Sequence, residues 1–180
     1  MNTDKIITFW FETHGPADWY KKDAVFDEKI RDQFLDTYGD LTKRDLPNDL
    51  QTADDALAAI IVLDQFSRNM FRDTPKAFAA DETARAITDM MVDKGWDCEL
   101  PDEQRHFVYM PYMHSEDIKD QEKMLEFSAA LAEDGKPSSW AVEHHRLIEK
   151  YGRFPHRNDI LGRQSTEAEK TYLKRPDAGF

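Results

Sequence analysis

The sequence predicts an all-α protein that forms a single domain of antiparallel helical hairpins over residues 1–180. Apolar side chains recur at intervals of three and four residues, which is the spacing of one helix face, and no segment keeps the alternation of a strand. Short connections rich in Gly, Pro and Ser separate the helical segments, and short connections favour antiparallel neighbours. A chain of this length can bury about two-thirds of its unfolded surface.

Four helices are expected in the first half of the chain. They cover residues 4–12, a segment from Asp23 to about Gly39, a segment that opens at Thr52, and a segment from Thr74 to Gly95. Thr52 with Asp55 resembles a capping box, and Thr74 with Pro75 supplies an N-cap and a first-turn proline. The helix after Thr52 should be central because its residues 56–63 are all apolar.

The second half predicts further helices with a break between them. Pro111 lacks a backbone donor, so we expect it to kink or end the helix that starts at Pro101, which leaves His114 at the break. Ser115 is expected to cap the next helix. Its inward face is predicted to carry Ile118, Leu125 and Ala129. The last two helices are predicted from Ser139 to Gly152 and after a capping box of Thr166 and Glu169.

Composition excludes several classes of partner. The chain carries 24 Lys and Arg against 36 Asp and Glu, a net charge of −12, so nucleic acid and anionic membranes are not expected partners. The apolar run at 56–63 is far too short to cross a bilayer. A lone Cys98 cannot form an intrachain disulfide, which favours a reducing cytoplasm.

The central helix carries charged residues on its apolar face. Asp64 and Arg68 continue the face of Leu57, Ile60 and Ile61, and a carboxylate and a guanidinium four residues apart can pair there. Charges in such positions need a partner, so the pair is either an internal fastener between helices or part of a functional site.

Histidines gather in the second half of the chain. His144 lies at helical spacing from Trp140, Leu147 and Ile148, with His145 on the adjoining face. His106, His114 and His156 complete the group. A neutral imidazole on a core face often does no more than bridge backbone groups, and that interpretation stays open beside a functional one.

The last third also contains a basic segment. Residues 1–120 hold all the net negative charge, whereas residues 150–163 carry Lys150, Arg153, Arg157 and Arg163 against Asp159. Arginines on a loop before a helix can bind a carboxylate or a phosphate. The equal alternative is that they pair with the protein's own acids.

Motifs for metals, nucleotides and nucleophiles are absent from the sequence. Glu103-x-x-His106 matches half of a di-iron pattern without its second half, and no HExxH occurs, so a zinc site could only come from scattered residues such as His114, Glu116, His144 and His156. No glycine-rich phosphate loop and no serine elbow is present. We therefore expect no metal and no cofactor.

Several motifs occur in an order that resembles the bacterial domain of unknown function 924 family. They are Ile6-Ile-Thr-Phe-Trp-Phe11, Phe26-Asp27, Leu63-Asp-Gln-Phe-Ser-Arg-Asn69, Phe107-Val-Tyr-Met-Pro-Tyr-Met-His-Ser-Glu116, Asp120-Gln-Glu122, Gly152-Arg-Phe-Pro-His-Arg-Asn158 and Leu161-Gly-Arg163. Ser67 stands where we expect the family to carry proline. The resemblance implies a fold of tetratricopeptide-like hairpins and no established activity.

We hypothesise that these polar residues converge on one pocket that binds a small anionic molecule. If the pocket is catalytic, His114 or His144 would be the general acid or base, oriented by Glu116 or Asp64. The ligand-binding candidates are Gln65, Arg68, Asn69, Gln121, His145, Arg153, His156, Arg157, Asn158 and Arg163. One alternative is a tetratricopeptide-like interaction module that binds a protein or peptide, and another is a metal-dependent hydrolase.

Overall fold

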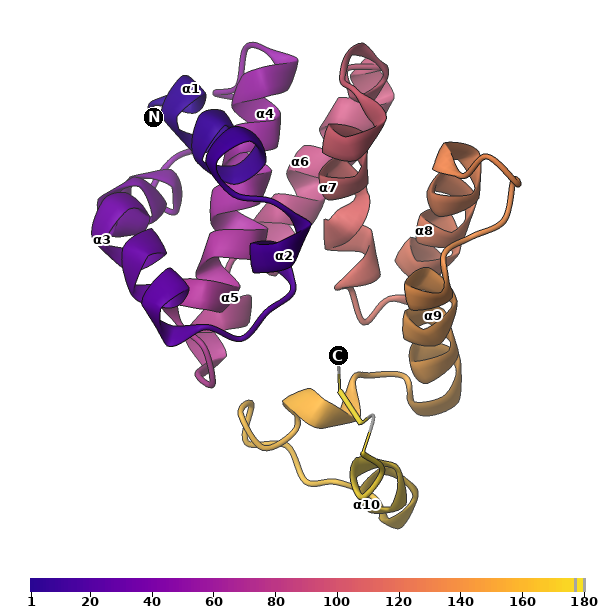
Figure 1. Ribbon diagram of the computed structural model, residues 1–180. Helices are drawn as coiled ribbons and strands as arrows, with labels where there is room; N and C mark the ends of the chain where they lie inside the picture. The colour runs from indigo at the N-terminus through magenta and orange to yellow at the C-terminus, as the bar shows by residue number, and fades with distance from the viewer. Residues whose placement is uncertain (177, 180) are drawn as a thin grey trace. The chain divides into compact units, whose positions relative to one another are not determined.

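The computed structural model describes residues 1–176 and 178–179 (Figure 1). These residues form helices joined by turns with no β-strand among them, so the all-α prediction is confirmed. They divide into two compact units, one of residues 1–72 and 76–111 and the other of residues 73–75 and 112–180. We describe each unit by itself, and the single tetratricopeptide-like domain stays a prediction. No helix in the described part of the chain is long and apolar enough to span a membrane.

The first unit holds most of the helices labelled in Figure 1. In chain order its elements are α1 (Thr3–Ile7), the π-helical turn η1 (Thr8–Thr13), α2 (Pro16–Trp19), α3 (Ala24–Leu41), α4 (Ala53–Ile60), the π-helical turn η2 (Ile61–Phe66), α5 (Ser67–Met70), the 3-10 turn η3 (Pro75–Phe78), α6 (Asp81–Lys94), the 3-10 turn η4 (Asp97–Glu99) and α7 (Asp102–Met113). Pro75 of η3 and the last two residues of α7 belong to the second unit. The first predicted helix is therefore α1 continued by a wider turn.

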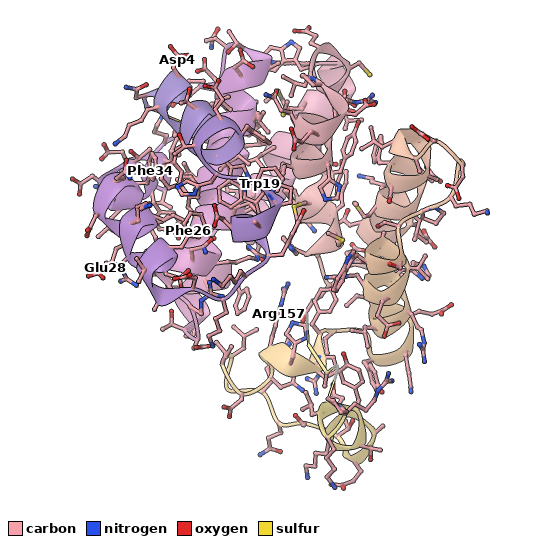
Figure 2. The ribbon with its side chains drawn as sticks, viewed as in Figure 1. Asp4, Trp19, Phe26, Glu28, Phe34 and Arg157 are labelled. Atoms are coloured by element: carbon pink, nitrogen blue, oxygen red, sulfur yellow. The ribbon has the colours of Figure 1, made fainter. Side chains whose placement is uncertain are left out.

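Aromatic side chains build the core of the first unit around α4. Every residue from Ala56 to Phe66 is buried, which confirms that this helix is central. Trp10 contacts Trp19, Phe66 and Phe107 with ring centroids 5.4–5.7 Å apart. Figure 2 labels Trp19, Phe26 and Phe34 among these side chains, and Asp4 and Glu28 on the solvent-exposed surface.

The predicted helix from Thr74 to Gly95 is wrong at its start. Pro75 opens the short turn η3, and α6 begins only at Asp81. The Ser67 hydroxyl donates a hydrogen bond to the Ala77 carbonyl at 3.1 Å. In a helix that began at Thr74, this carbonyl would instead accept from a backbone amide of the same helix. The predicted end is confirmed, because Gly95 ends α6 with a φ of 70°, which glycine adopts without strain.

Of the two effects predicted for Pro111, an end of the helix near Met110 is wrong, and a kink stays a prediction. Helix α7 continues to Met113, and His114 follows in the turn as expected. The proline removes one backbone hydrogen bond, but Met110, Tyr112 and Met113 are all buried. Burial of large apolar side chains contributes about 1.5–3 kcal/mol each, which offsets the lost bond.

The second unit is built on a helical hairpin. Helices α8 (Ile118–Leu131) and α9 (Ser139–Tyr151) pack against each other and are followed by the 3-10 turn η5 (Pro155–Arg157) and α10 (Glu167–Leu173). Its core cluster joins Leu147, Ile148, Phe154 and Tyr172. The capping box of Thr166 and Glu169 is present at the start of α10, as predicted.

The predictions for α8 are wrong in two details. The cap is Asp117, whose carboxylate accepts from the Lys119 amide, while Ser115 accepts from the amide of Asp117. The buried face carries Asp120, Gln121, Met124 and Ser128, and Ile118 is 36% exposed. The spacing of apolar residues does not indicate this face, because most of its side chains are polar and are buried together with their hydrogen-bond partners.

Candidate functional site

Arg68 joins three parts of the first unit. Its guanidinium donates two hydrogen bonds to the Asp81 carboxylate, at 3.0 and 2.9 Å. It also lies 3.0 Å from the fully buried Asp64 carboxylate and donates to the Asp64 carbonyl at 2.7 Å. The predicted pair of Asp64 and Arg68 is confirmed, and its bond to Asp81 ties η2 and α5 to the first turn of α6.

Asn69 belongs to a second fastener in the same unit. Its amide donates to Asp27 on α3 at 2.8 Å, and Arg72 donates two hydrogen bonds to the same carboxylate at 2.6 and 2.7 Å. Asn69 therefore helps to hold α5 against α3. The ligand role predicted for Asn69 stays a prediction.

Gln65 and Ser67 lie on either side of Phe66 and face buried partners. The Gln65 amide donates to Asp64 and lies 3.4 Å from the Met110 sulfur. The Ser67 hydroxyl lies 3.2 Å from the Asp64 carbonyl in addition to its contact with Ala77. A proline at position 67 would have no side-chain donor, so serine adds a link here that the expected family residue lacks.

In the second unit, Gln121 holds the turn that carries His114. Its Nε2 donates to the carbonyls of Tyr112, Met113 and Ser115 at 3.1, 2.8 and 2.7 Å. The side chain is fully buried. It thereby satisfies carbonyls at the end of α7 that have no partner inside the helix.

Glu116 fixes the loop after α9 to the start of α8. Its carboxylate accepts two hydrogen bonds from Arg163, at 2.6 and 3.0 Å, and one from the Phe154 amide at 2.8 Å. Arg163 also donates to Asn158 at 3.0 Å. Although burial opposes the shift, the bonds from Arg163 hold the pKa of Glu116 below its ordinary value.

Arg153 also forms an ion pair with a carboxylate of the protein. It binds Glu169 on α10 through two hydrogen bonds of 2.7 and 2.9 Å, and these bonds lower the pKa of Glu169 to about 2. Two arginines of the basic segment, Arg153 and Arg163, therefore pair internally, as the alternative interpretation predicted. The third, Arg157, lies in a different setting.

Arg157 belongs to a group that we call the Phe154 cluster: Phe154, His114, His144, His156 and Arg157. The Arg157 guanidinium lies 4.5 Å from the centre of the buried Phe154 ring. The rings of His144 and His156 lie 5.5 and 5.6 Å from the same ring, and His114 lies 6.4 Å from His144. Arg157, labelled in Figure 2, comes from η5, and His144 comes from α9.

Burial, reinforced by neighbouring positive groups, keeps two imidazoles of this cluster, those of His144 and His156, neutral. Burial, followed by the influence of His114, lowers the pKa of His144 to about 3. Burial, followed by the charge of Arg157, lowers the pKa of His156 to about 4. Two uncharged imidazoles thus lie next to one permanent cation at neutral pH.

The tautomer of His144 is set by its own helix. Its Nδ1 lies 2.8 Å from the Trp140 carbonyl, which can only accept a hydrogen bond. Nδ1 therefore carries the proton, and the lone pair of the neutral ring lies on Nε2. An imidazole held this way can accept a proton or a hydrogen bond at Nε2.

The described residues offer no metal site. Among them, no three His, Cys, Asp or Glu side chains lie close enough together to hold an ion. The hydrolase alternative therefore has no ligand set in this part of the chain. A shallow hollow of about 590 Å³ lies between the start of α8 and the end of α9, lined by Glu116, Asp117, Ile118, Ile148, Glu149 and Gly152.

The predicted site residues thus fall into two groups. Asp64, Gln65, Arg68 and Asn69 belong to the first unit, and the others belong to the second. Their convergence on one pocket stays a prediction, because each unit is described by itself. His145 is half-buried beside His144 on α9.

Sequence reasoning missed several partners of the predicted residues. Asp27, Asp81 and Glu169 each bind a predicted arginine or asparagine, and Phe154 is the ring around which the histidines gather. Asp27 and Phe154 lie inside quoted family motifs, so those motifs already marked them. Asp81 carries no such signal.

Comparison with known proteins agrees with the resemblance drawn from the motifs. The family model described as "Bacterial protein of unknown function (DUF924)" matches residues 6–177. A solved structure, "Structure of Protein of Unknown Function ATU0120 from Agrobacterium tumefaciens", is 36% identical and similar over 96% of each chain with a TM-score of 0.87. No curated protein matches. The chain belongs to the bacterial DUF924 family of unknown function.

Proposed function

We propose that the Phe154 cluster binds a small anion and that His144 accepts or donates a proton there. The observation that carries the proposal is a guanidinium and two imidazoles around one buried ring, with a third imidazole, that of His114, 6.4 Å from His144. His114 and His156 are half-buried and therefore reach solvent, whereas Arg157 and His144 are buried. A buried cation with neutral imidazoles beside it supplies charge and directed N–H groups for an oxyanion.

The neighbouring carboxylate supports this assignment. Glu116 influences the cluster, but its oxygens accept hydrogen bonds from Arg163 and from the Phe154 amide. Arg163 therefore balances most of the charge of Glu116. An anion beside Arg157 would stabilise the folded protein in proportion to its affinity and concentration.

A thermal-shift titration tests the proposal. Sulfate, phosphate and small carboxylates are added at constant ionic strength, with sodium chloride as the reference. We expect at least one of these anions to raise the Tm of the wild type, and Arg157→Ala and Arg157→Gln to abolish the rise. Arg146→Ala removes an exposed arginine from the same unit and should keep it. Stabilisation equal to that by chloride, or unchanged in the Arg157 variants, would contradict anion binding at this cluster.

A second candidate function is a protein-interaction module. Two observations favour it: Arg68 and Arg163 fasten elements together, and the α8–α9 hollow has the apolar Ile118 and Ile148 between three acids. Such a surface suits a peptide with a basic side chain. If no anion raises the Tm in the titration, the interaction module is favoured over the anion site.

A further inference from the structure

We infer that the hollow between the start of α8 and the end of α9 binds an aliphatic diamine or polyamine, a ligand whose ammonium groups are joined by methylene chains. The hollow lies within the second unit, on the hairpin of the two helices (Figure 1). Its volume of about 590 Å³ is in the range of small-molecule sites. The inference is independent of the anion site, and it assigns a small ligand to the hollow that the second candidate function would use for a peptide.

Two carboxylates give the hollow its negative charge. Asp117 and Glu149 are both exposed, and in the part of the chain that the structure describes neither has a cation within ion-pair distance. The third acid, Glu116, accepts hydrogen bonds of 2.6 and 3.0 Å from Arg163, which balances most of its charge. The hollow therefore offers two negative charges to a ligand.

The groups next to these carboxylates do not neutralise them. The Asp117 carboxylate accepts from the Lys119 amide at 2.9 Å, and this backbone group has no net charge. Lys150 follows Glu149 in the sequence, but its ammonium lies over the Tyr151 ring, 5.0 Å from the ring centre. Ammonium groups of a ligand can therefore pair with both carboxylates without breaking an ion pair of the protein.

Two isoleucines distinguish this hollow from a purely acidic patch. Ile148 is buried and Ile118 is 36% exposed, and both belong to the lining that holds the carboxylates. Methylene groups that cover Ile118 leave water, which favours binding. An inorganic cation has no such groups, so acids beside an apolar surface favour ammonium groups on a hydrocarbon chain.

Amide NMR of the full chain during a titration with cadaverine tests the inference. Cadaverine carries two ammonium groups on five methylenes, and both groups are charged at pH 7, as lysine is. At constant ionic strength, we expect saturable shifts of the amides of the lining residues. Pentylamine, which has one ammonium group, should bind more weakly. Pentanediol and magnesium chloride should produce no saturable shifts at these amides.

Variants that remove one charge each locate the binding. Asp117→Asn keeps a side-chain oxygen that can cap α8, and Glu149→Gln keeps the size of an exposed side chain. Each should weaken cadaverine binding by up to about fivefold, the effect of one exposed ion pair, and the double variant should weaken it further. Glu133→Gln removes the same charge beyond the other end of α8 and should leave the affinity unchanged.

Cadaverine binding that is weakened by Asp117→Asn and Glu149→Gln, and not by Glu133→Gln, supports the inference. The absence of saturable shifts, equal shifts with magnesium, or equal weakening by Glu133→Gln overturns it. A lysine-containing peptide that shifts the lining amides while cadaverine does not would overturn it and leave the interaction module standing. The anion titration has its own readout in the Arg157 variants, so the two sites stand or fall separately.

Discussion

Arg68 shows how the charge of a single side chain stabilises the fold of this protein. Asp64 is fully buried, and its charge is tolerated because the Arg68 guanidinium lies 3.0 Å away. A buried carboxylate without its cation keeps the cost of desolvation and loses the compensating attraction. The contribution of Arg68 is therefore visible mainly when it is removed.

Arg68→Ala should destabilise the protein by about 3–5 kcal/mol, because it leaves the buried Asp64 without its cation and Asp81 without its bidentate partner. Urea unfolding followed by circular dichroism measures this difference. Arg146→Ala breaks an exposed ion pair with Glu143 and should cost less than about 1 kcal/mol. Equal losses in the two variants would show that burial of the Asp64 pair is not what matters.

Residue-scale features were predictable where a few consecutive positions decide them. The predicted caps at Thr52 and Thr166 need only four neighbouring residues, and both are present. The pair of Asp64 and Arg68 was also readable, because it lies within one helical turn. The bond from Arg163 to Glu116 spans 47 positions, and no local pattern specifies such a partner.

At the scale of elements, α10 is attached to the rest of the second unit by a few side chains. Tyr172 packs in the cluster of Leu147, Ile148 and Phe154. Arg153 supplies the polar attachment through its two bonds to Glu169. A helix of seven residues is too short to be stable alone, so it depends on these contacts.

Arg153→Ala should loosen α10 without unfolding the other helices. We expect faster amide hydrogen exchange across residues 167–173 and a Tm lower by about 2–4 °C. Lys170→Ala removes an exposed pair on the same helix and serves as the control. Exchange in α10 that is as slow in Arg153→Ala as in the wild type would mean that Tyr172 alone attaches this helix.

Element boundaries were less predictable than element existence. Thr74 and Pro75 form a good helix start in isolation, yet the Ala77 carbonyl binds Ser67 and the helix begins later. Pro111 is a good stop signal, yet α7 passes it because the following side chains are buried. In both cases a contact with a distant residue outweighs a local preference.

At the scale of the whole molecule, buried titratable groups make stability depend on pH. The folded-state pKa values of His144 and His156, about 3 and 4, lie below the ordinary value of 6.5. Below pH 6.5 these two histidines therefore bind protons in the unfolded chain but stay unprotonated in the folded chain. Glu169, at about 2 instead of 4.5, acts in the same direction at lower pH. Acid weakens the fold through all three groups.

The free energy of unfolding should be nearly constant from pH 7.5 to 6.5 and should then fall by on the order of 1 kcal/mol per pH unit for each of the two histidines. Urea unfolding at half-unit steps down to pH 4.5 measures this slope. The double variant His144→Gln, His156→Gln should flatten it above pH 5. A wild-type curve that stays level to pH 5 would contradict neutral burial of these imidazoles.

The candidate site was predictable at this scale only in part. The histidines of the second half of the chain and the arginines of residues 150–163 indicated residues of the Phe154 cluster, and the net positive charge of that segment indicated an anion. The sequence does not say which residue each arginine contacts: Arg153 binds Glu169, Arg163 binds Glu116, and Arg157 lies over the Phe154 ring. That choice is made by three-dimensional packing of distant segments.

The π-helical turn η2 lets homologues differ in length by one residue at this point. Its hydrogen bonds join residues five positions apart instead of four, so it behaves as an α-helix with one inserted residue. Deletion of a single residue from 61–66 would restore a regular helix and leave the residues that follow in nearly the same orientation. Arg68 would then still face Asp81. A gap of one residue in this stretch of an alignment is therefore compatible with the same fastening of α6.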